Sequence, residues 1–385
     1  MRVILKVIFI LLLTSVLACL PLLKNSFPTY SIENELMIVQ RPPIEQEIIQ
    51  EMTLEEKVGQ LFVFGFSGLD GSGEILEFIQ SMHIGGVLLL GKNISSNDQL
   101  KTLNETLQSM STIPLFISID QEGGIVARIK GNDTLTLSQK YMDTPQEAYD
   151  IAKERGKILK DLGINVNLAP VVEYITNPSS FLYQRVFRGN VEEISLKSKS
   201  AIEGYTESKI ACVAKHYPGH SNSSVDSHFG LPKVYISQNE FNDYIYPFKY
   251  LIEQNSVDMI MVGHILYPNI DSNPSTVSTI LLTQKLRDEL KYDGVLITDD
   301  MEMDSIEGVG EYCEVAKDAL IAGNDILLYS GLINVQREVY GCVLSAVQNK
   351  ELEIDMIHEK VERILRLKAK FNIVNYTTLQ GLLER

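Results

Sequence analysis

Eight short apolar runs recur along the chain, and each is followed by a longer amphipathic stretch. The runs are rich in aliphatic and β-branched side chains and show little alternation between apolar and polar residues. This pattern is typical of strands that are covered on both faces in a parallel sheet. The predicted strands are Leu61–Phe66, Gly86–Leu90, Leu115–Ile119, Ile164–Leu168, Ile210–Ala214, Met259–Val262, Val295–Thr298 and Ile326–Tyr329.

Helical patterns lie between these runs. The segment Thr144-Pro145-Gln146-Glu147 forms a capping box with proline in the first turn. Amphipathic segments at Leu282–Lys291, Tyr312–Ala322 and Asp355–Phe371 are also predicted to be helices. Eight strand-and-helix repeats without a break in composition predict one α/β catalytic domain, a (β/α)8 TIM-like barrel over 45–375.

Such a barrel carries its active site at the carboxyl ends of the strands. Polar residues stand at that position after several of the predicted strands, which predicts a polar pocket at one end of the barrel. These residues are Asp120, Glu173, Lys215, His216, His264 and Asp299.

The segment Lys215–Pro232, KHYPGHSNSSVDSHFGLP, holds three of the six histidines of the chain. His216 and His220 have the i, i+4 spacing of two zinc ligands on a helix, and Asp226 or His228 would complete the site. Pro218 and Gly219 lie between the two histidines, however, and proline is excluded from a helix interior. We therefore favour a loop, and the prediction for metal is none.

In such a loop Asp226 and His228 are two residues apart, so in extended backbone their side chains share a face and form a hydrogen bond. A carboxylate bound to one imidazole nitrogen leaves the other free to transfer a proton. Asp299 is the candidate partner, as a nucleophile in a two-step displacement at an acetal carbon. Because Asp300 and Glu302 are close by, a cation site or an ordinary helix N-terminal turn remains an alternative.

At this point the chain resembles glycoside hydrolase family 3, in its β-N-acetylhexosaminidase branch. The resemblance runs from about Glu51 to Phe371. It rests on KHYPGHSNSSVDSHFGLP, on IDQEGGIVARI at Ile119–Ile129 and on ITDDMEM at Ile297–Met303, with support from Met52–Phe62, Gly85–Leu90, Gly263–Asp271 and Asp293–Asp300.

The resemblance implies a retaining exo-β-N-acetylglucosaminidase that works without metal or cofactor on amino-sugar oligosaccharides. It implies that Asp299 is the nucleophile, that His228 is the acid/base with Asp226 as its partner, and that a further set of residues binds the sugar. That set is Asp120, Arg128, Arg185, Lys215 and His216. The chain departs from the usual family residues at Ile125, Glu173, Arg188 and Ser221, which affects the prediction for the aglycone and for Arg185.

Four other functions remain open. The same fold serves β-glucosidases and glycoside phosphorylases, and a sugar-binding lipoprotein without activity would keep the same pocket. A zinc hydrolase is the remaining alternative.

The N-terminal residues 1–19 have the features of a secretory signal, with Arg2 and Lys6 before an apolar run and small residues before Cys19. The last four residues resemble a bacterial lipobox, in which the cysteine is lipidated. Residues 20–44 contain four prolines and are predicted to be a tether, and 376–385 a C-terminal tail. We expect an extracytoplasmic protein, secreted or held to the membrane only through a lipid on Cys19.

The formal net charge of −16 at pH 7 argues against a nucleic-acid partner and against binding to anionic lipid head groups. The other cysteines, Cys212, Cys313 and Cys342, are odd in number and lack a CxxC spacing. We expect them to be buried apolar residues rather than a disulfide framework or a metal site.

Overall fold

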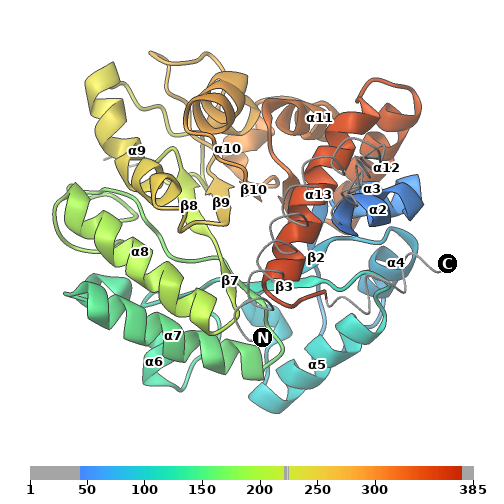
Figure 1. Cartoon of the computed structure of the whole chain (residues 1–385), viewed down its shortest axis with the longest axis horizontal. Coiled ribbons are helices and arrows are strands. Elements are labelled where there is room, and N and C mark those ends of the chain that lie inside the picture. Colours follow the sequence, from blue (N-terminus) through green and yellow to red (C-terminus); the bar gives the residue numbers. More distant parts are fainter. Residues whose placement is uncertain (1–43, 221–222, 224, 375–385) are drawn as a thin grey trace, which may run out of the picture. The chain divides into compact units, whose positions relative to one another are not determined.

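The computed structural model describes residues 44–220, 223 and 225–374 (Figure 1). The predicted signal peptide and C-terminal tail, and all of the predicted tether except Ile44, lie outside these residues. In the described part of the chain no helix is both long enough and apolar enough to cross a membrane.

The strands form one parallel sheet that is closed by a single run of chain. In the described residues its nine segments follow the order β7-β6-β3-β2-β1-β11-β10-β9-β8. The segments at its two ends, β7 and β8, are separated in sequence by Val213 alone, whose N–H lies 3.1 Å from Asn167 O and 3.0 Å from Ala169 O. The run from Ala211 to Tyr217 therefore pairs with β6 on one side and with β9 on the other. The predicted TIM-like barrel is confirmed, with this run as its fifth strand.

All eight predicted strands are present. Their observed bounds are β1 Phe62–Gly65, β2 Gly86–Leu89, β3 Phe116–Ile119, β6 Val166–Asn167, β7 Ala211–Cys212, β8 Ala214–Tyr217, β9 Met259–Val262, β10 Val295–Asp300 and β11 Ile326–Tyr329. Every residue of β1, β2, β3 and β9 is buried, which explains the absence of alternation in their sequences.

Helices surround the sheet (Figure 1). They are α2 Ile44–Glu51, α3 Leu54–Gly59, α4 Glu74–Ser81, α5 Asn97–Ser109, α6 Asp133–Thr136, α7 Pro145–Asp161, α8 Val191–Glu207, α9 Gln238–Glu253, α10 Asp304–Glu307, α11 Tyr312–Ala322, α12 Ile333–Gln348 and α13 Ile354–Lys370. The capping box before α7 is confirmed, since Thr144 and Glu147 bond each other's backbone N–H groups. The helix predicted at Leu282–Lys291 is instead a π-helical segment at Ile280–Glu289.

The prediction for two of the cysteines was wrong. Cys313, at the start of α11, and Cys342, in α12, form a disulfide with a Cα–Cα distance of 5.7 Å, and Cys212 is a buried free thiol. The bond joins two neighbouring helices of the outer layer, a contact that depends on how those helices pack. The spacing of cysteines along the chain carries no signal for such a pair.

Candidate active site

A cavity of about 250 Å³ lies at the carboxyl ends of the strands. It is lined by residues of β2, β8, β9, β10 and β11 and by residues of the segments that follow β3 and other strands. Polar residues on its wall are Asp120, Glu122, Arg128, Arg185, Lys215, His216, His228, Asp299, Asp300 and Ser330. The volume is smaller than that of sites for drug-sized ligands, which indicates room for about one sugar ring. The predicted polar pocket at this end of the barrel is thus present.

A network of two carboxylates and two cations forms one wall of the cavity. Lys215 Nζ lies 2.8 Å from Asp120 Oδ1 and 2.7 Å from Glu122 Oε1. Arg185 binds Glu122 in a bidentate pair at 2.7 and 2.9 Å. Asp120 and Glu122 are two residues apart after β3, so their side chains share one face. Glu122 lies within the motif Ile119–Ile129, but no role was predicted for it. Its position two residues after Asp120 is the sequence signal that could have identified it.

The charged groups of this network stabilise one another in their ionised forms. Burial alone would raise the pKa of Asp120, but Lys215 and Arg128 outweigh it and place that pKa below its ordinary value. Burial would likewise lower the pKa of Lys215, yet Asp120 and Glu122 raise it above its ordinary value. All of these groups are therefore ionised at neutral pH and present fixed charges to the cavity.

A hairpin after β3 holds Arg128 beside Asp120. Its strands are β4 Gln121–Gly123 and β5 Val126–Ala127. The buried Gln121 side chain accepts from the N–H of Arg128 and of Ile129 at 3.0 and 2.9 Å, which fixes the returning strand. Arg128 Nη2 then reaches Asp120 Oδ2 at 3.2 Å.

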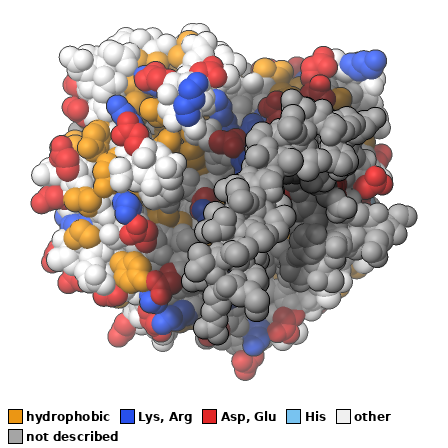
Figure 2. All heavy atoms as spheres, viewed as in Figure 1, with side chains coloured by type: hydrophobic (Ala, Val, Ile, Leu, Met, Phe, Trp, Pro, Cys, Tyr) orange, Lys and Arg blue, Asp and Glu red, His pale blue; other side chains and the backbone are white. Residues whose placement is uncertain are grey.

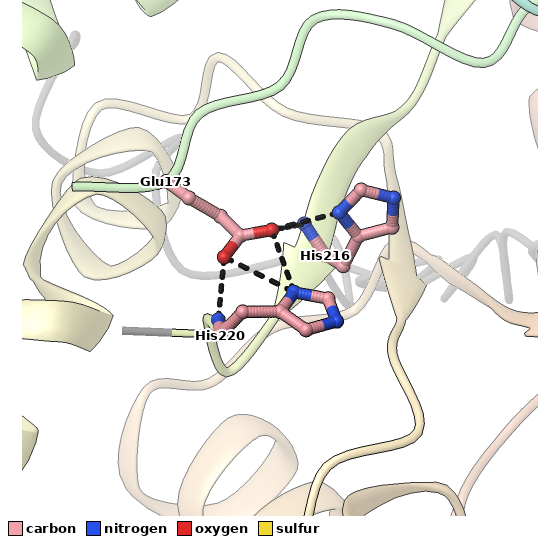
Figure 3. A group of neighbouring side chains, drawn as sticks. All are labelled: Glu173, His216 and His220. Atoms are coloured by element: carbon pink, nitrogen blue, oxygen red, sulfur yellow. Dashed lines mark hydrogen bonds and ion pairs between the residues drawn. The ribbon is translucent and has the colours of Figure 1, made fainter. Parts of the chain in front are cut away.

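Glu173 joins the two histidines that the zinc interpretation had paired (Figure 3). Its Oε1 lies 2.7 Å from His216 Nδ1 and 3.1 Å from His220 Nδ1, and its two oxygens accept from the backbone N–H groups of both histidines. All three side chains are buried. Because His216 uses Nδ1 for Glu173, its Nε2 remains for the cavity that His216 lines.

Among the described residues, these same three have potential ligand atoms that lie close enough together to hold a metal ion. One atom from each lies within 4.8 Å of the others. The helix expected for a zinc site is absent, yet the loop brings His216 and His220 together with ring centroids 5.2 Å apart. Glu173, which replaces the aspartate usual at this position in the predicted family, is the third member. Asp226 and His228, which the zinc interpretation had named, are not part of the group.

Burial and the contacts within this cluster act on its protonation in opposite directions. Burial lowers the pKa of His216 even though the Glu173 carboxylate raises it. For Glu173, burial would raise the pKa, but the two imidazoles lower it below the ordinary range of a glutamate. His216 is therefore a neutral imidazole and Glu173 a carboxylate at neutral pH.

The acidic residues at the end of β10 separate into three environments. The carboxylate of Asp300 accepts hydrogen bonds from Ser330 and from Glu302 N, and that of Glu302 accepts from the N–H groups of Gly331 and Leu332 at 2.6 Å. Among the described residues, the Asp299 carboxylate accepts a hydrogen bond from Asp300 N, at 2.9 Å. Burial would raise the pKa of Asp299, but His216 and His264 lower it. Asp299 is thus an ionised carboxylate on the cavity wall.

Asp226 and His228 form the predicted pair, but through a turn. His228 Nδ1 lies 2.7 Å from Asp226 Oδ1, and the same oxygen accepts from His228 N at 3.0 Å. The bond from His228 N to Asp226 Oδ1 closes an Asx turn, and Phe229 N donates to Asp226 O to close a β-turn, in place of the expected extended backbone. The His228 side chain is 59% exposed, and it lines the same cavity as Asp299.

Two of the six predicted strand-end residues, Glu173 and His264, are not on the cavity wall. His264 is fully buried, with Nδ1 2.6 Å from Thr276 Oγ1 and Nε2 3.0 Å from Asp300 O. It supports the end of β10 from behind. The other four, Asp120, Lys215, His216 and Asp299, all line the cavity.

The comparisons with known proteins agree with this geometry. The model of the glycosyl hydrolase family 3 N-terminal domain matches residues 53–367. The chain belongs to glycoside hydrolase family 3. A β-hexosaminidase A of Pseudoalteromonas piscicida is 32% identical over 77% of this chain, and a β-hexosaminidase of Haemophilus ducreyi is 31% identical over 70%. The chain spans 55% of the first relative's length, and the second match covers 80% of its relative.

Among solved structures of family 3, a β-N-acetylglucosaminidase from Paenibacillus sp. str. FPU-7 superposes with a TM-score of 0.79 at 31% identity. The match covers 87% of this chain and 68% of that one. The predicted family and its hexosaminidase branch are therefore confirmed.

Proposed function

We propose that this family 3 member is a retaining exo-β-N-acetylglucosaminidase that removes terminal β-linked N-acetylglucosamine from amino-sugar oligomers. One observation carries the proposal: Asp299 and His228 line the same cavity of about 250 Å³. Asp299 is ionised and unpaired with any described lysine or arginine, and His228 is bound to Asp226 through Nδ1 alone. A nucleophile and a proton donor that share one cavity are what a two-step displacement requires.

In the first step the Asp299 carboxylate attacks the anomeric carbon and the bond from that carbon to the leaving oxygen breaks. The imidazolium of His228 gives its proton to this oxygen, and Asp226 stabilises the imidazolium meanwhile. In the second step neutral His228 takes a proton from water, and the resulting hydroxide equivalent displaces Asp299 from the anomeric carbon. The sugar leaves with its original β configuration, and both side chains return to their starting states.

The network around Asp120 supplies the contacts to the sugar in this proposal. Asp120 accepts hydrogen bonds from hydroxyl groups, while Arg128 and Lys215 donate to them. His216 accepts a hydroxyl hydrogen bond through Nε2, since its one N–H lies on Nδ1 and is donated to the Glu173 carboxylate. Arg185 is held so tightly by Glu122 that we assign it the role of fixing Glu122 and Lys215 rather than a separate sugar contact. Fixed donors and acceptors stabilise the charge that develops on the ring without reorganising.

We further propose that the protein acts outside the cytoplasm on cell-wall fragments, tethered by a lipid on Cys19. The Cys313–Cys342 disulfide supports this location, because structural disulfides persist in oxidising compartments. Among the described residues that are visible in Figure 2, acidic and basic side chains are interspersed and form no extended basic surface for a polyanion.

The experiment is an assay of the purified protein on aryl N-acetyl-β-glucosaminide and on aryl β-glucoside. We expect turnover of the first and a rate at least about 10²-fold lower on the second, because the site must lose its contacts to the acetamido group. Nuclear magnetic resonance of the initial product should show the β anomer. No turnover of either substrate would contradict the proposal and support a binding protein without activity.

Two additions separate the remaining alternatives. Phosphate at millimolar concentration should leave the free sugar as product, whereas a phosphorylase would form a sugar phosphate. A chelator should leave the rate unchanged, whereas loss of activity that zinc restores would support catalysis through the Glu173, His216 and His220 group.

A further inference from the structure

A separate cavity of about 230 Å³ lies between β11 and the start of α11, and we call it the β11–α11 cavity. Gly310 and Glu311 line it, are exposed and mark its opening. It shares no described lining residue with the catalytic cavity, and no step of the proposed reaction uses it. Its buried wall consists of apolar side chains and one tyrosine, namely Met301, Ile306, Val315 and Tyr329.

The hydroxyl group of Tyr329 is the polar group of this buried wall. The Tyr329 side chain is fully buried, and among the described residues no group forms a hydrogen bond with its Oη. Burial raises the pKa of Tyr329, and the carboxylates of Glu302 and Asp300 raise it further, so the hydroxyl is a neutral donor at neutral pH. A buried donor without an acceptor costs free energy, which an acceptor atom in the cavity would recover.

The charges near the cavity determine which acceptor fits. The carboxylates of Asp300 and Glu302 act on Tyr329, and Glu311 lines the opening, so an anion would be repelled. Helix α11 begins at the same opening, and its N-cap residue Glu311 makes no capping hydrogen bond with its side chain. The first N–H groups of α11 are therefore further donors for a neutral oxygen.

The volume of the cavity limits the size of a ligand. An apolar cavity of about 150 Å³ in a protein interior binds benzene. The β11–α11 cavity, at about 230 Å³, therefore has room for one six-membered ring that carries a small substituent.

The segment 299–303 forms part of the wall of both cavities. Asp299 and Met303 line the catalytic cavity, whereas Met301 lines the β11–α11 cavity. Met301 N donates to Leu328 O at 2.9 Å, and Leu328 also lines the catalytic cavity. A molecule that packs against Met301 therefore contacts the short segment that carries the proposed nucleophile.

We propose that the β11–α11 cavity is an effector site for a small neutral molecule with an apolar body and one hydrogen-bond-accepting oxygen. The Tyr329 hydroxyl donates to that oxygen, and the apolar body packs on Met301, Ile306 and Val315. Because the segment 299–303 is shared, occupancy of this cavity and catalysis at Asp299 affect each other. The binding does not depend on the proposed function, whereas the effect on turnover rests on it.

The binding test compares three probes that share a benzene ring. Acetophenone has a neutral acceptor oxygen, ethylbenzene has no acceptor and benzoate is an anion. Ligand-observed nuclear magnetic resonance should give a dissociation constant for acetophenone about 5-fold lower than that for ethylbenzene, because only acetophenone accepts the hydrogen bond. Benzoate should bind most weakly, because carboxylates surround the site.

Tyr329→Phe removes the hydroxyl and keeps the ring. It should raise the dissociation constant of acetophenone about 5-fold, to that of ethylbenzene, and leave the value for ethylbenzene unchanged. Tyr340→Phe is the matched control, because among the described residues the buried Tyr340 hydroxyl also has no hydrogen-bond partner, but Tyr340 does not line either cavity. It should leave all three dissociation constants unchanged. Neither variant should lower the free energy of unfolding.

The effect on turnover is measured with aryl N-acetyl-β-glucosaminide as substrate. Saturating acetophenone should change kcat of the wild-type protein and of Tyr340→Phe by about 5-fold, and at the same concentration it should have a smaller effect on Tyr329→Phe. A rise in KM alone would place acetophenone in the catalytic cavity and overturn the effector site.

Two further outcomes would contradict the proposal. Equal affinity for acetophenone and ethylbenzene, or an equal loss of affinity in Tyr329→Phe and Tyr340→Phe, would show that the Tyr329 hydroxyl binds no ligand and would overturn the site. No turnover of the aryl substrate by the wild-type protein would overturn the proposed function and the effector role, while the dissociation constants would still decide whether the site exists.

Discussion

The two ends of the barrel both hold buried charges next to a cavity, and they use these charges differently. At the amino ends of the strands a cavity of about 580 Å³ is more than twice as large as the catalytic cavity. Several charged side chains on or beside its wall form ion pairs: Asp325 binds Arg287 and Arg363, Arg366 binds Asp293, and Lys370 binds Asp258. At the carboxyl ends, Asp299 and His228 line the same cavity, and each can still form a hydrogen bond with a ligand there.

The difference teaches that volume is a poor guide to function in this fold. A charge whose hydrogen bonds are all made stabilises the fold and reacts slowly, because any reaction must first break those bonds. Asp299 accepts a hydrogen bond from one backbone N–H, whereas Asp325 has ion pairs with two arginines and a hydrogen bond from Leu296 N. Substitutions at the two ends of the barrel are therefore expected to have different effects on activity and on stability.

The largest effect is expected for Asp299→Asn. An amide cannot attack the anomeric carbon, so kcat/KM on every substrate should fall by about 10⁴-fold or more. The free energy of unfolding should change little, because the side chain forms no ion pair with a described residue. Addition of azide should restore part of the rate and give an α-glycosyl azide with an activated substrate.

Asp325→Asn is the counterpart at the other end. It should lower the free energy of unfolding by about 3–5 kcal/mol, because two arginines lose their buried partner, and leave kcat of the folded fraction unchanged. Denaturant titration with activity measured on the same samples checks this. A loss of kcat without a loss of stability would mean that the two ends are not functionally separate.

His228→Ala should have an effect that depends on the leaving group. On substrates whose leaving group is a sugar, kcat should fall by about 10³-fold, because no other described group is placed to protonate the departing oxygen. On dinitrophenyl N-acetylglucosaminide the first step should be nearly unchanged, since that leaving group needs no proton. Equal losses on both substrates would remove His228 from the acid role.

Replacing both Cys313 and Cys342 by serine tests the outer layer. The bond closes a loop with a sequence separation of 29, so its removal should cost about 3 kcal/mol of stability, while kcat at 25 °C stays the same. Thermal unfolding with and without a reductant gives the same comparison for the wild-type protein. A fall in kcat would show that the disulfide also fixes the mouth.

The smallest effect concerns Lys368, which lies beneath the barrel with its Nζ 2.7 Å from Gln60 Oε1. Burial lowers its pKa to about 7, against about 10.4 in an unfolded chain. Between these two pH values the unfolded chain binds about one proton more than the folded protein, so the free energy of unfolding rises with pH. It levels off above pH ~10, where Lys368 is neutral in both states, and reaches its lower limit below pH ~7, where Lys368 is charged in both states. The stability of the wild-type protein relative to Lys368→Met should therefore rise by about 2 kcal/mol from pH 7 to pH 9. A flat difference would contradict a neutral Lys368.

The sequence was sufficient for the barrel because its strands are buried on both faces and their apolar runs have no competing interpretation. It was sufficient for Asp120, Lys215, His216 and Asp299 because strand ends converge on one pocket in this topology. It could not show that Glu122 joins Lys215 to Arg185, or that Glu173 joins His216 to His220, since both contacts depend on loops that meet only in three dimensions. The Cys313–Cys342 bond and the Asx turn at Asp226 were missed for the same reason.

The run from Ala211 to Tyr217 closes the cylinder and also carries Lys215 and His216 on its inner wall. The seam of the architecture and the floor of the pocket are thus the same few residues. A change that loosens the closure must also displace the ammonium group and the imidazole from the bottom of the cavity. In this protein, closure of the barrel and the arrangement of the pocket depend on the same residues, so neither can change without the other.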